Sequence, residues 1–174
     1  MKVEKTIDIN ASREAIWDVI GTRFADAHEW ASPVDRSSSS AGAHAIAGAP
    51  TNGRTCETSI GMIRENLLTY DEDAKQLSYE AFSDQLPSFV KGLVAIWRLS
   101  DGPGNTSRVH MTLNVDIAPP FNVLMGLMMK LKMGGIAMTT IKDLKHYVET
   151  GEPSDEKKEA ALKYEKKSAR KAAA

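Results

Sequence analysis

The stretch Pro119–Gly151, PPFNVLMGLMMKLKMGGIAMTTIKDLKHYVETG, is the longest helical pattern in this chain of 174 residues. At 1.5 Å per residue it predicts a helix about 45 Å long, which is longer than an ordinary globular helix. Pro120 suits the first turn of such a helix, and Gly151 followed by Pro153 predicts a clean end. We therefore expect a fold organised around one long helix near the C-terminal end.

The two halves of this stretch differ in composition. The first half carries four methionines and three glycines, with a fifth methionine, Met138, just beyond it, and the pair Gly134-Gly135 is the expected position of a kink. Methionine is flexible and polarizable, so this half suits either an irregular core or a surface that contacts a ligand. The second half, Ala137–Val148, has a regular aliphatic stripe that predicts an anchor on a sheet.

The composition is that of a globular protein, with 42% apolar and 26% charged residues and a net charge of −1. This charge gives no support to a nucleic-acid surface. The longest uncharged run, Ile117–Met129, is shorter than the roughly 20 residues that a spanning helix needs, so we expect no membrane span. The single Cys56 excludes an internal disulfide, and the chain starts without an apolar signal segment. A cytoplasmic location is the default expectation.

Alternation of apolar and polar residues predicts strands before the long helix. It is clearest in Lys2–Asn10 and Ser107–Ile117. Further strands are expected over Arg54–Ile60, Ile63–Tyr70, Gln76–Phe82 and Phe89–Leu99, with a weaker polar strand or a loop in Val34–Ala45. Strands in succession, joined by short turns, predict an α+β fold with an antiparallel meander and helices on one face.

Local signals predict the connections. Ser12 is placed to cap a short helix that Gly21 would end, and a second short helix is expected within Arg23–His28. The run Gly48–Gly53, GAPTNG, is a strong turn signal, and its last two residues, Asn52-Gly53, suit a hairpin.

The last segment, Glu152–Ala174, has few large apolar side chains. Ser154 is placed to cap a helix, and the acidic-to-basic order along the segment matches a helix dipole. We expect a domain over residues 1–151 and a solvated helical or frayed tail over 152–174, with a partner-docking arm as the alternative.

Short motifs spread over about residues 1–150 resemble those of the START-like or SRPBCC superfamily, which includes polyketide cyclase/dehydrase, lipid-transport and Bet v 1-like proteins. The motifs are Ile7–Ser12 followed by Ile16–Val19, Trp30 before Pro33, Ile63–Leu67 leading to Tyr70-Asp71, Leu77–Tyr79, and Leu144–Glu149. The resemblance implies a helix-grip fold, in which a curved antiparallel sheet of about six or seven strands wraps the long helix. It also implies a cavity between them for an apolar ligand.

Aromatic and methionine side chains are the candidates for contacting that ligand. Trp30, Tyr79 and Trp97 each combine a large apolar body with one polar group, which suits a pocket that orients a mostly apolar molecule. The other ligand-binding candidates are Met111, Leu113, Phe121, Met125, Met128 and Met129. Ordinary core packing is the alternative for each.

Glu65 is the ionisable residue of greatest interest, and it is a candidate for both ligand binding and catalysis. It shares strand parity with Ile63 and Leu67, so on a concave face it would point into an apolar cavity with a raised pKa. The alternative places Glu65 toward solvent and Arg64 toward the cavity. The catalytic candidates are therefore Glu65, Tyr79 and Arg64.

Other chemistry has little support in the sequence. His28 and Glu29 precede Trp30, but a loop histidine beside an acid is far more often solvated than catalytic. The sequence has no HExxH, GxSxG, GxGxxG or phosphate-binding loop, so we expect no metal and no cofactor. Cys56 is expected to be a buried, inert thiol.

Three functions follow from these observations. The favoured one is a carrier or sensor of a lipid-, polyketide- or isoprenoid-like molecule. The second is an enzyme of the cyclase, aromatase or dehydratase kind that uses the same cavity. The third is a protein-interaction module that uses the tail and the open sheet edges. A monomer and a homodimer are both compatible with the sequence.

Overall fold

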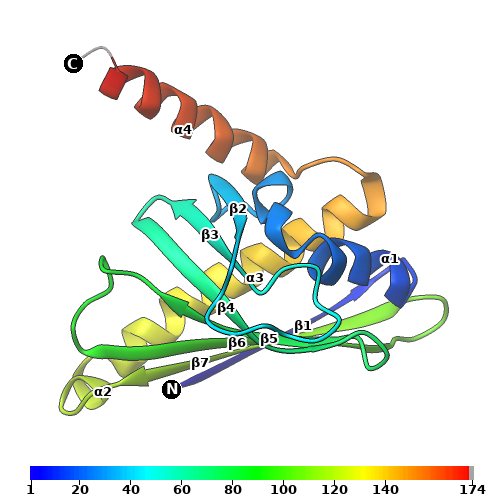
Figure 1. Ribbon diagram of the computed structural model, residues 1–174, viewed down its shortest axis with the longest axis horizontal. Helices are drawn as coiled ribbons and strands as arrows, with labels where there is room; N and C mark the ends of the chain where they lie inside the picture. The colour runs from blue at the N-terminus through cyan, green and yellow to red at the C-terminus, as the bar shows by residue number, and fades with distance from the viewer. Residues whose placement is uncertain (173–174) are drawn as a thin grey trace.

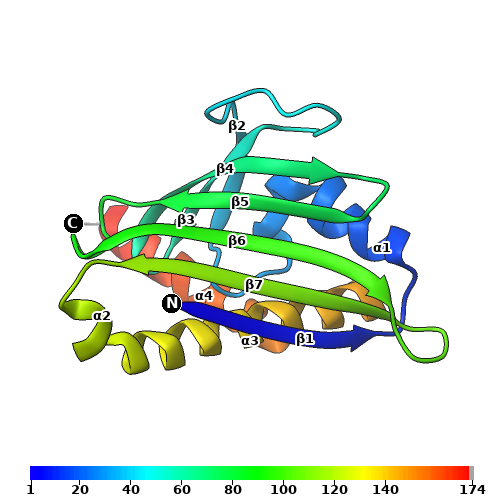
Figure 2. The same ribbon diagram turned by 90° about the horizontal axis from the view of Figure 1, so that it is seen from below.

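A computed structural model describes residues 1–172, within which seven strands form one antiparallel sheet in the order β1-β7-β6-β5-β4-β3-β2 (Figures 1 and 2). The strands are β1 (Lys2–Ile9), β2 (Arg36–Ser40), β3 (Gly53–Thr58), β4 (Gly61–Asp71), β5 (Gln76–Phe82), β6 (Val90–Asp101) and β7 (Ser107–Ile117). Each of the expected strands is present. The sheet is curved, so it has a concave and a convex face.

Helical segments follow the first strand and the last one. They are α1 (Arg13–Trp17), η1 (Asp18–Thr22), η2 (Phe24–Glu29), α2 (Phe121–Leu124), α3 (Gly126–Thr150) and α4 (Asp155–Ala172). The Ser12 hydroxyl accepts a hydrogen bond from the Ala15 N–H at 3.2 Å and caps α1 as expected. The whole arrangement is the α+β helix-grip fold.

The long helix α3 lies along one side of the concave face. It packs chiefly against β1 and β7, while η2 packs against β2 and β3 at the opposite side. Figure 2 shows β1 as the edge strand next to α3. The middle strands β4, β5 and β6 therefore have a concave face that α3 borders and does not fully cover.

The core lies between the concave face and the helical segments. Its fully buried side chains include Ile9, Ile16, Trp17, Phe24, Leu67, Leu77, Val109, Val115, Ile141 and Leu144. They come from both ends of the chain, which explains why the first strand and the last helix belong to one fold.

The turn expected within Gly48–Gly53 is part of a longer loop, and the hairpin expected at Asn52-Gly53 is wrong. A loop over residues 41–52 joins β2 to β3, and Gly53 is already in β3, paired with Ser40. A Cβ atom at Gly53 would lie 2.5 Å from the backbone oxygen of Glu65. Glycine is therefore needed here for the close approach of β4, not for a turn.

The expected end of the first helix at Gly21 is also wrong, because η1 continues to Thr22. A Cβ atom at Gly21 would lie 2.5 Å from the indole ring of Trp17. This glycine makes room for the buried Trp17 side chain instead of ending the helix.

The long helical pattern is broken, but not where a kink was expected. The interruption lies at Met125, between α2 and α3, and α3 runs as one helix through Gly134-Gly135. A Cβ atom at Gly134 would lie 3.7 Å from Cε of Lys5, so this side of α3 faces β1.

The C-terminal helix α4 is attached to the rest of the chain by its first turn and by Tyr164, whose hydroxyl donates to Oε2 of Glu57 on β3 at 2.8 Å. The Ser154 hydroxyl donates to Oδ1 of Asp143 at 2.5 Å and accepts from the Lys157 N–H at 3.1 Å. The Lys157 ammonium donates to the Val34 carbonyl oxygen at 2.6 Å. Figure 1 shows the last turns of α4, near the C-terminus, extending away from the sheet. The last two residues of the expected tail, 173–174, lie outside the described residues.

Candidate functional site

Three neighbouring strands bring polar side chains to the concave face. In the register of the sheet, Arg54 on β3 lies opposite Glu65 on β4, and Leu67 on β4 lies opposite Tyr79 on β5. Opposite residues of an antiparallel pair project from the same face. Cys56, two residues beyond Arg54, projects from this face as well.

Arg54 is held by contacts on several sides. Its Nε donates to Oε2 of Glu65 at 2.5 Å, and its Nη1 donates to the backbone oxygen of Phe24 at 2.6 Å. Its guanidinium carbon lies 4.1 Å from the centre of the Phe24 ring and 5.3 Å from that of Tyr79. The side chains of Arg54 and Glu65 are only 9% and 12% exposed. Burying a charged guanidinium is costly, and a carboxylate partner with hydrogen bonds offsets that cost.

The surroundings set the protonation states of this cluster. Burial by itself would lower the pKa of Arg54, but the adjoining Glu65 carboxylate raises it above the ordinary value. Burial raises the pKa of Cys56 to about 12. Burial also raises the pKa of Tyr79 well above its usual range, and the charge of Glu65 adds to that effect. At neutral pH the tyrosine and cysteine are therefore protonated, so neither a phenolate nor a thiolate is available as a nucleophile or base.

Five of the residues expected to bind a ligand lie together on or beside this face: Trp30, Tyr79, Trp97, Met111 and Leu113. The rings of Trp30 and Trp97 meet edge to face with their centres 6.5 Å apart. The Nε1 atom of Trp30 is buried and has no hydrogen-bond partner among the described residues. We call this group the aromatic floor. Its Trp30 N–H is available to donate a hydrogen bond to a ligand.

The expected ligand contacts on the helices lie in different surroundings. Phe121 stacks on Phe89 with the ring centres 4.7 Å apart, at the rim of the molecule. Met128 is 57% exposed, whereas Met125 and Met129 are half-buried. Successive residues of a helix are about 100° apart, so Met128 points away from the side that carries Met129.

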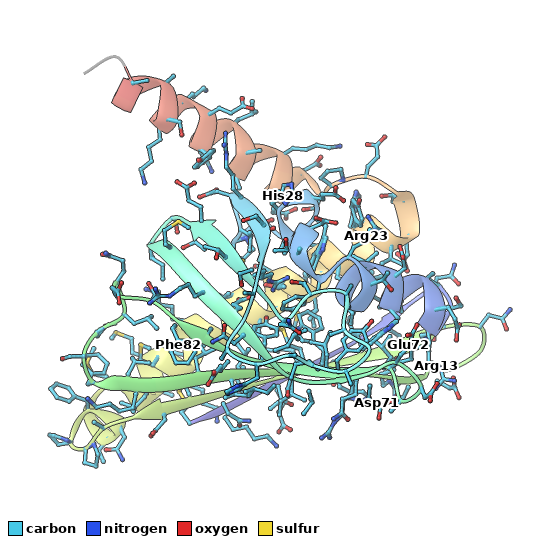
Figure 3. All side chains as sticks on the ribbon, in the orientation of Figure 1. Arg13, Arg23, His28, Asp71, Glu72 and Phe82 are labelled. Atoms are coloured by element: carbon cyan, nitrogen blue, oxygen red, sulfur yellow. The ribbon has the colours of Figure 1, made fainter. Side chains whose placement is uncertain are left out.

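The concave face is closed at one end and partly open at the other. Leu67, Tyr79 and Trp97 are buried, but Ile63 and Leu93, which project from the same face, are only half-buried. The open end lies near Phe82, the last residue of β5. Figure 3 shows Phe82 on the other side of the molecule from Arg23. Glu65 lies between the open end and the aromatic floor.

The sheet itself splits at the open end. Pairing between β5 and β6 stops at Glu80 and Val94, and the loop over residues 83–89 lies beyond that point. A hollow of about 540 Å³ occurs there, lined by Arg64, Asn66 and residues 81–84, 86–88 and 90–92. Another hollow of about 400 Å³ lies between the start of α1 and the β6–β7 turn. Neither hollow is lined by the residues expected to bind the ligand.

The remaining expected site residues lie away from the cluster. Arg64 is on the convex face with a side chain 65% exposed, 3.9 Å from Asp84. His28 Nδ1 lies 2.9 Å from the Ser37 hydroxyl, which itself donates to the Ala25 carbonyl oxygen. Over residues 1–172, no three histidine, cysteine or acidic side chains are arranged to hold a metal ion.

Sequence reasoning missed Arg54, the central residue of the cluster. Arg54 alternates with Cys56 in the expected strand, so the two share a face, and a buried cysteine implies that the arginine is buried as well. That signal was present, but the partner of Arg54 depends on the register between β3 and β4.

Comparisons with known proteins agree with the fold. The chain superposes on a START superfamily protein from Mycobacterium smegmatis with a TM-score of 0.66 at 16% identity, covering 85% of this chain and 97% of that one. An uncharacterized protein from Bacillus thuringiensis gives 0.65 at 18% identity, with coverages of 85% and 98%. The protein Ara h 8.0201 gives 0.62 at 11% identity, with coverages of 85% and 97%.

Comparisons of the sequence alone give one family match and no curated relative. No curated protein matches the sequence of this chain. Residues 1–149 match the family described as polyketide cyclase/dehydrase and lipid transport. The chain therefore belongs to this polyketide cyclase/dehydrase and lipid transport family and has the START-like fold.

Proposed function

We propose that the chain binds a hydrophobic small molecule, lipid-, polyketide- or isoprenoid-like, on the concave face, and acts as its carrier or sensor. The observation that carries this proposal is the partly open concave face. The inward side chains Ile63 and Leu93 are apolar and yet half-exposed, and they lead to the buried pair Arg54–Glu65. An apolar surface with a few convergent polar groups is the usual form of a small-molecule site.

The polar groups favour a particular kind of ligand. Arg54 donates to Glu65 and to the Phe24 carbonyl oxygen, whereas no hydrogen bond reaches Oε1 of Glu65 within residues 1–172. A carboxylate oxygen accepts hydrogen bonds. We therefore expect a mostly apolar ligand whose polar group donates one, such as a hydroxyl, and expect Glu65 to repel an anionic head group.

The half-buried methionines complete the site. Gly134 faces β1, and Met129 and Met133 lie on the flank of α3 that is turned away from β1. This flank borders the uncovered part of the concave face. Flexible thioether side chains adapt to ligands of different shape.

Binding without turnover is favoured over the cyclase alternative. The protonation states of Tyr79 and Cys56 suit hydrogen-bond donors, not bases. Glu65 is paired with Arg54, so it does not stand as an isolated acid in an apolar cavity.

A matched pair of substitutions tests the proposal. Ile63→Trp adds bulk to the concave face, while Met62→Trp adds the same bulk to the convex face one residue earlier, where Met62 is 52% exposed. Native mass spectrometry would first measure binding of a long-chain alcohol and of the fatty acid of equal length to the unchanged chain. We expect the alcohol to bind more tightly than the acid.

Ile63→Trp should weaken alcohol binding at least tenfold, and Met62→Trp should leave it unchanged. Thermal unfolding of both variants would confirm that they fold. Equal binding by the two variants, or no binding by the unchanged chain, would refute a ligand site on the concave face.

A further inference from the structure

Large apolar side chains remain exposed on α2 and on the first turns of α3. Val123 is 83% exposed, Leu127 74%, Leu131 70% and Met128 57%. We call these four residues the outer stripe. Figures 1 and 2 show this segment at one end of the molecule, beside the beginning of β1. Apolar residues scattered singly on a surface need no explanation, but a contiguous group does.

The outer stripe is separate from the proposed ligand site. The buried stripe of α3 contains Ala137, Ile141 and Leu144. At about 100° per residue, the three α3 members of the outer stripe are centred roughly 120° from the buried stripe, on the side away from Met129 and Met133. A ligand on the concave face would therefore leave the outer stripe uncovered.

Two lysines flank the outer stripe. Both Lys130 and Lys132 are exposed, and by the helical rotation they lie on opposite sides of the stripe, each roughly 100° from its centre. The sequence contains no acidic residue between Asp116 and Asp143. Within this segment, the apolar surface is therefore bordered by positive charge alone.

We propose that the outer stripe docks on the surface of a lipid bilayer that carries anionic head groups. An apolar helical face bordered by lysines is the form of a helix that lies in a membrane interface, where the apolar side chains enter the acyl boundary. The lysine stems extend along the apolar region while their ammonium groups meet the lipid phosphates. The segment would lie on the membrane, since within residues 1–172 no helix is long and apolar enough to cross it.

The positive charge of the two lysines disfavours a second copy of the chain as the partner of the outer stripe. Pairing of two outer stripes would bring Lys130 and Lys132 of both copies to one interface. No acidic residue of the same segment is present to pair with them. Like charges placed together at an interface are unfavourable, whereas anionic lipids supply the missing counter-charge.

Vesicle sedimentation of the full chain tests this proposal. One set of vesicles would contain phosphatidylcholine alone, and the other would contain phosphatidylcholine with about a third phosphatidylglycerol. We expect the chain to sediment with the anionic vesicles, at least tenfold more weakly with the neutral ones, and more weakly in 0.5 M salt, because salt screens exposed charges.

Two double variants assign the binding to the outer stripe. L127Q/L131Q removes the apolar contact, and K130E/K132E reverses the flanking charge. Each should reduce binding to anionic vesicles at least tenfold. The matched controls lie on α4: Leu162→Gln, at a side chain 56% exposed, and K166E/K167E, at two exposed lysines. The controls should bind as the unchanged chain does.

Sedimentation velocity would be measured on the same samples. Failure of the unchanged chain to bind anionic vesicles would overturn the proposal, and so would an equal loss in the α4 controls. A concentration-dependent dimer abolished by L127Q/L131Q would also overturn it, in favour of a second copy. The proposal does not rest on ligand binding, because Ile63→Trp changes the concave face on β4, not the outer stripe, and should leave vesicle binding intact.

Discussion

The two halves of α3 belong to one continuous helix but have opposite relations to the rest of the molecule. In the second half, Ala137, Ile141 and Leu144 are completely buried against the sheet. In the first half, Leu127 and Leu131 have more than two thirds of their surface exposed. Both halves carry apolar residues at helical spacing. Helical periodicity therefore shows which residues share a face, but not whether that face has a partner.

Polar contacts add to the difference. In the second half, the buried Asp143 carboxylate accepts from the Ser154 hydroxyl and from the Ser32 N–H at 2.8 Å. Lys145 donates to the backbone oxygen of Asp8 at 2.7 Å, and Glu149 accepts from the Asn10 N–H at 2.7 Å. These bonds connect α3 to three distant parts of the chain. The second half of α3 therefore anchors the helix to the rest of the fold, whereas the first half presents apolar side chains at the surface.

Two leucine-to-alanine substitutions on the same helix would test this contrast with the largest expected effect. Leu144→Ala creates a cavity in the core and should lower the free energy of unfolding by about 2–5 kcal/mol. Leu131→Ala removes an exposed side chain and should change it by less than about 0.5 kcal/mol. Urea unfolding measures both. Similar losses for the two variants would show that the first half is packed as tightly as the second.

The buried carboxylate of Asp143 provides the next test. The two carboxylate oxygens of Asp143 each accept one hydrogen bond, from the Ser32 N–H and from the Ser154 hydroxyl. Asp143→Asn replaces one of these oxygens by an NH₂ group, which cannot accept, so one of the two donors loses its acceptor. We expect a loss of about 1–3 kcal/mol in unfolding free energy, because a buried group loses its partner. Asp116→Asn, at an exposed position, is the control. If both variants unfold at the same urea concentration, Asp143 is not an anchor of α3 and α4.

The smallest expected effect concerns pH. Burial would raise the pKa of Glu149, but the hydrogen bonds from the Asn10 N–H and from Lys145 outweigh it and lower the pKa. A lowered carboxyl pKa stabilises the fold above the unfolded value, about 4.3, and this contribution is lost as the pH falls through the folded value.

Glu149→Gln should therefore cost about 0.5 kcal/mol at pH 7. At pH 3 its unfolding free energy should be closer to that of the unchanged chain. Urea titrations at the two pH values measure the difference. A cost that is the same at both would mean that the Glu149 charge has no role in attaching α3 to β1.

Much of the architecture could be predicted because the strands alternate regularly. Ser107–Ile117 and Gln76–Phe82 have the predicted bounds, since period-two alternation is a local property of the sequence. The turn at Asn52-Gly53 was predicted wrongly because the close approach of Glu65 to Gly53 depends on strand pairing, which local sequence does not specify. Glycine marks either a turn or a close contact, and only the fold distinguishes them.

The site could be predicted less completely for the same reason. The alternation of side chains along the strand placed Glu65 and Leu67 on one face of the sheet. It did not show whether that face was the concave one. The pairing of Glu65 with Arg54 depends on the β3–β4 register, and the contact of Arg54 with Phe24 joins segments 30 residues apart. Neither follows from spacing along the chain.

Hydrogen–deuterium exchange along α3 tests the central claim most directly, because it compares the two halves in one experiment on the unchanged chain. Amides in buried, well-packed helix exchange only through costly opening, whereas poorly covered turns open readily. We predict that the amides of residues 127–135 exchange at least tenfold faster than those of residues 138–148. The faster group should slow on addition of anionic vesicles. Uniform protection along the whole of α3, unchanged by vesicles, would contradict the account.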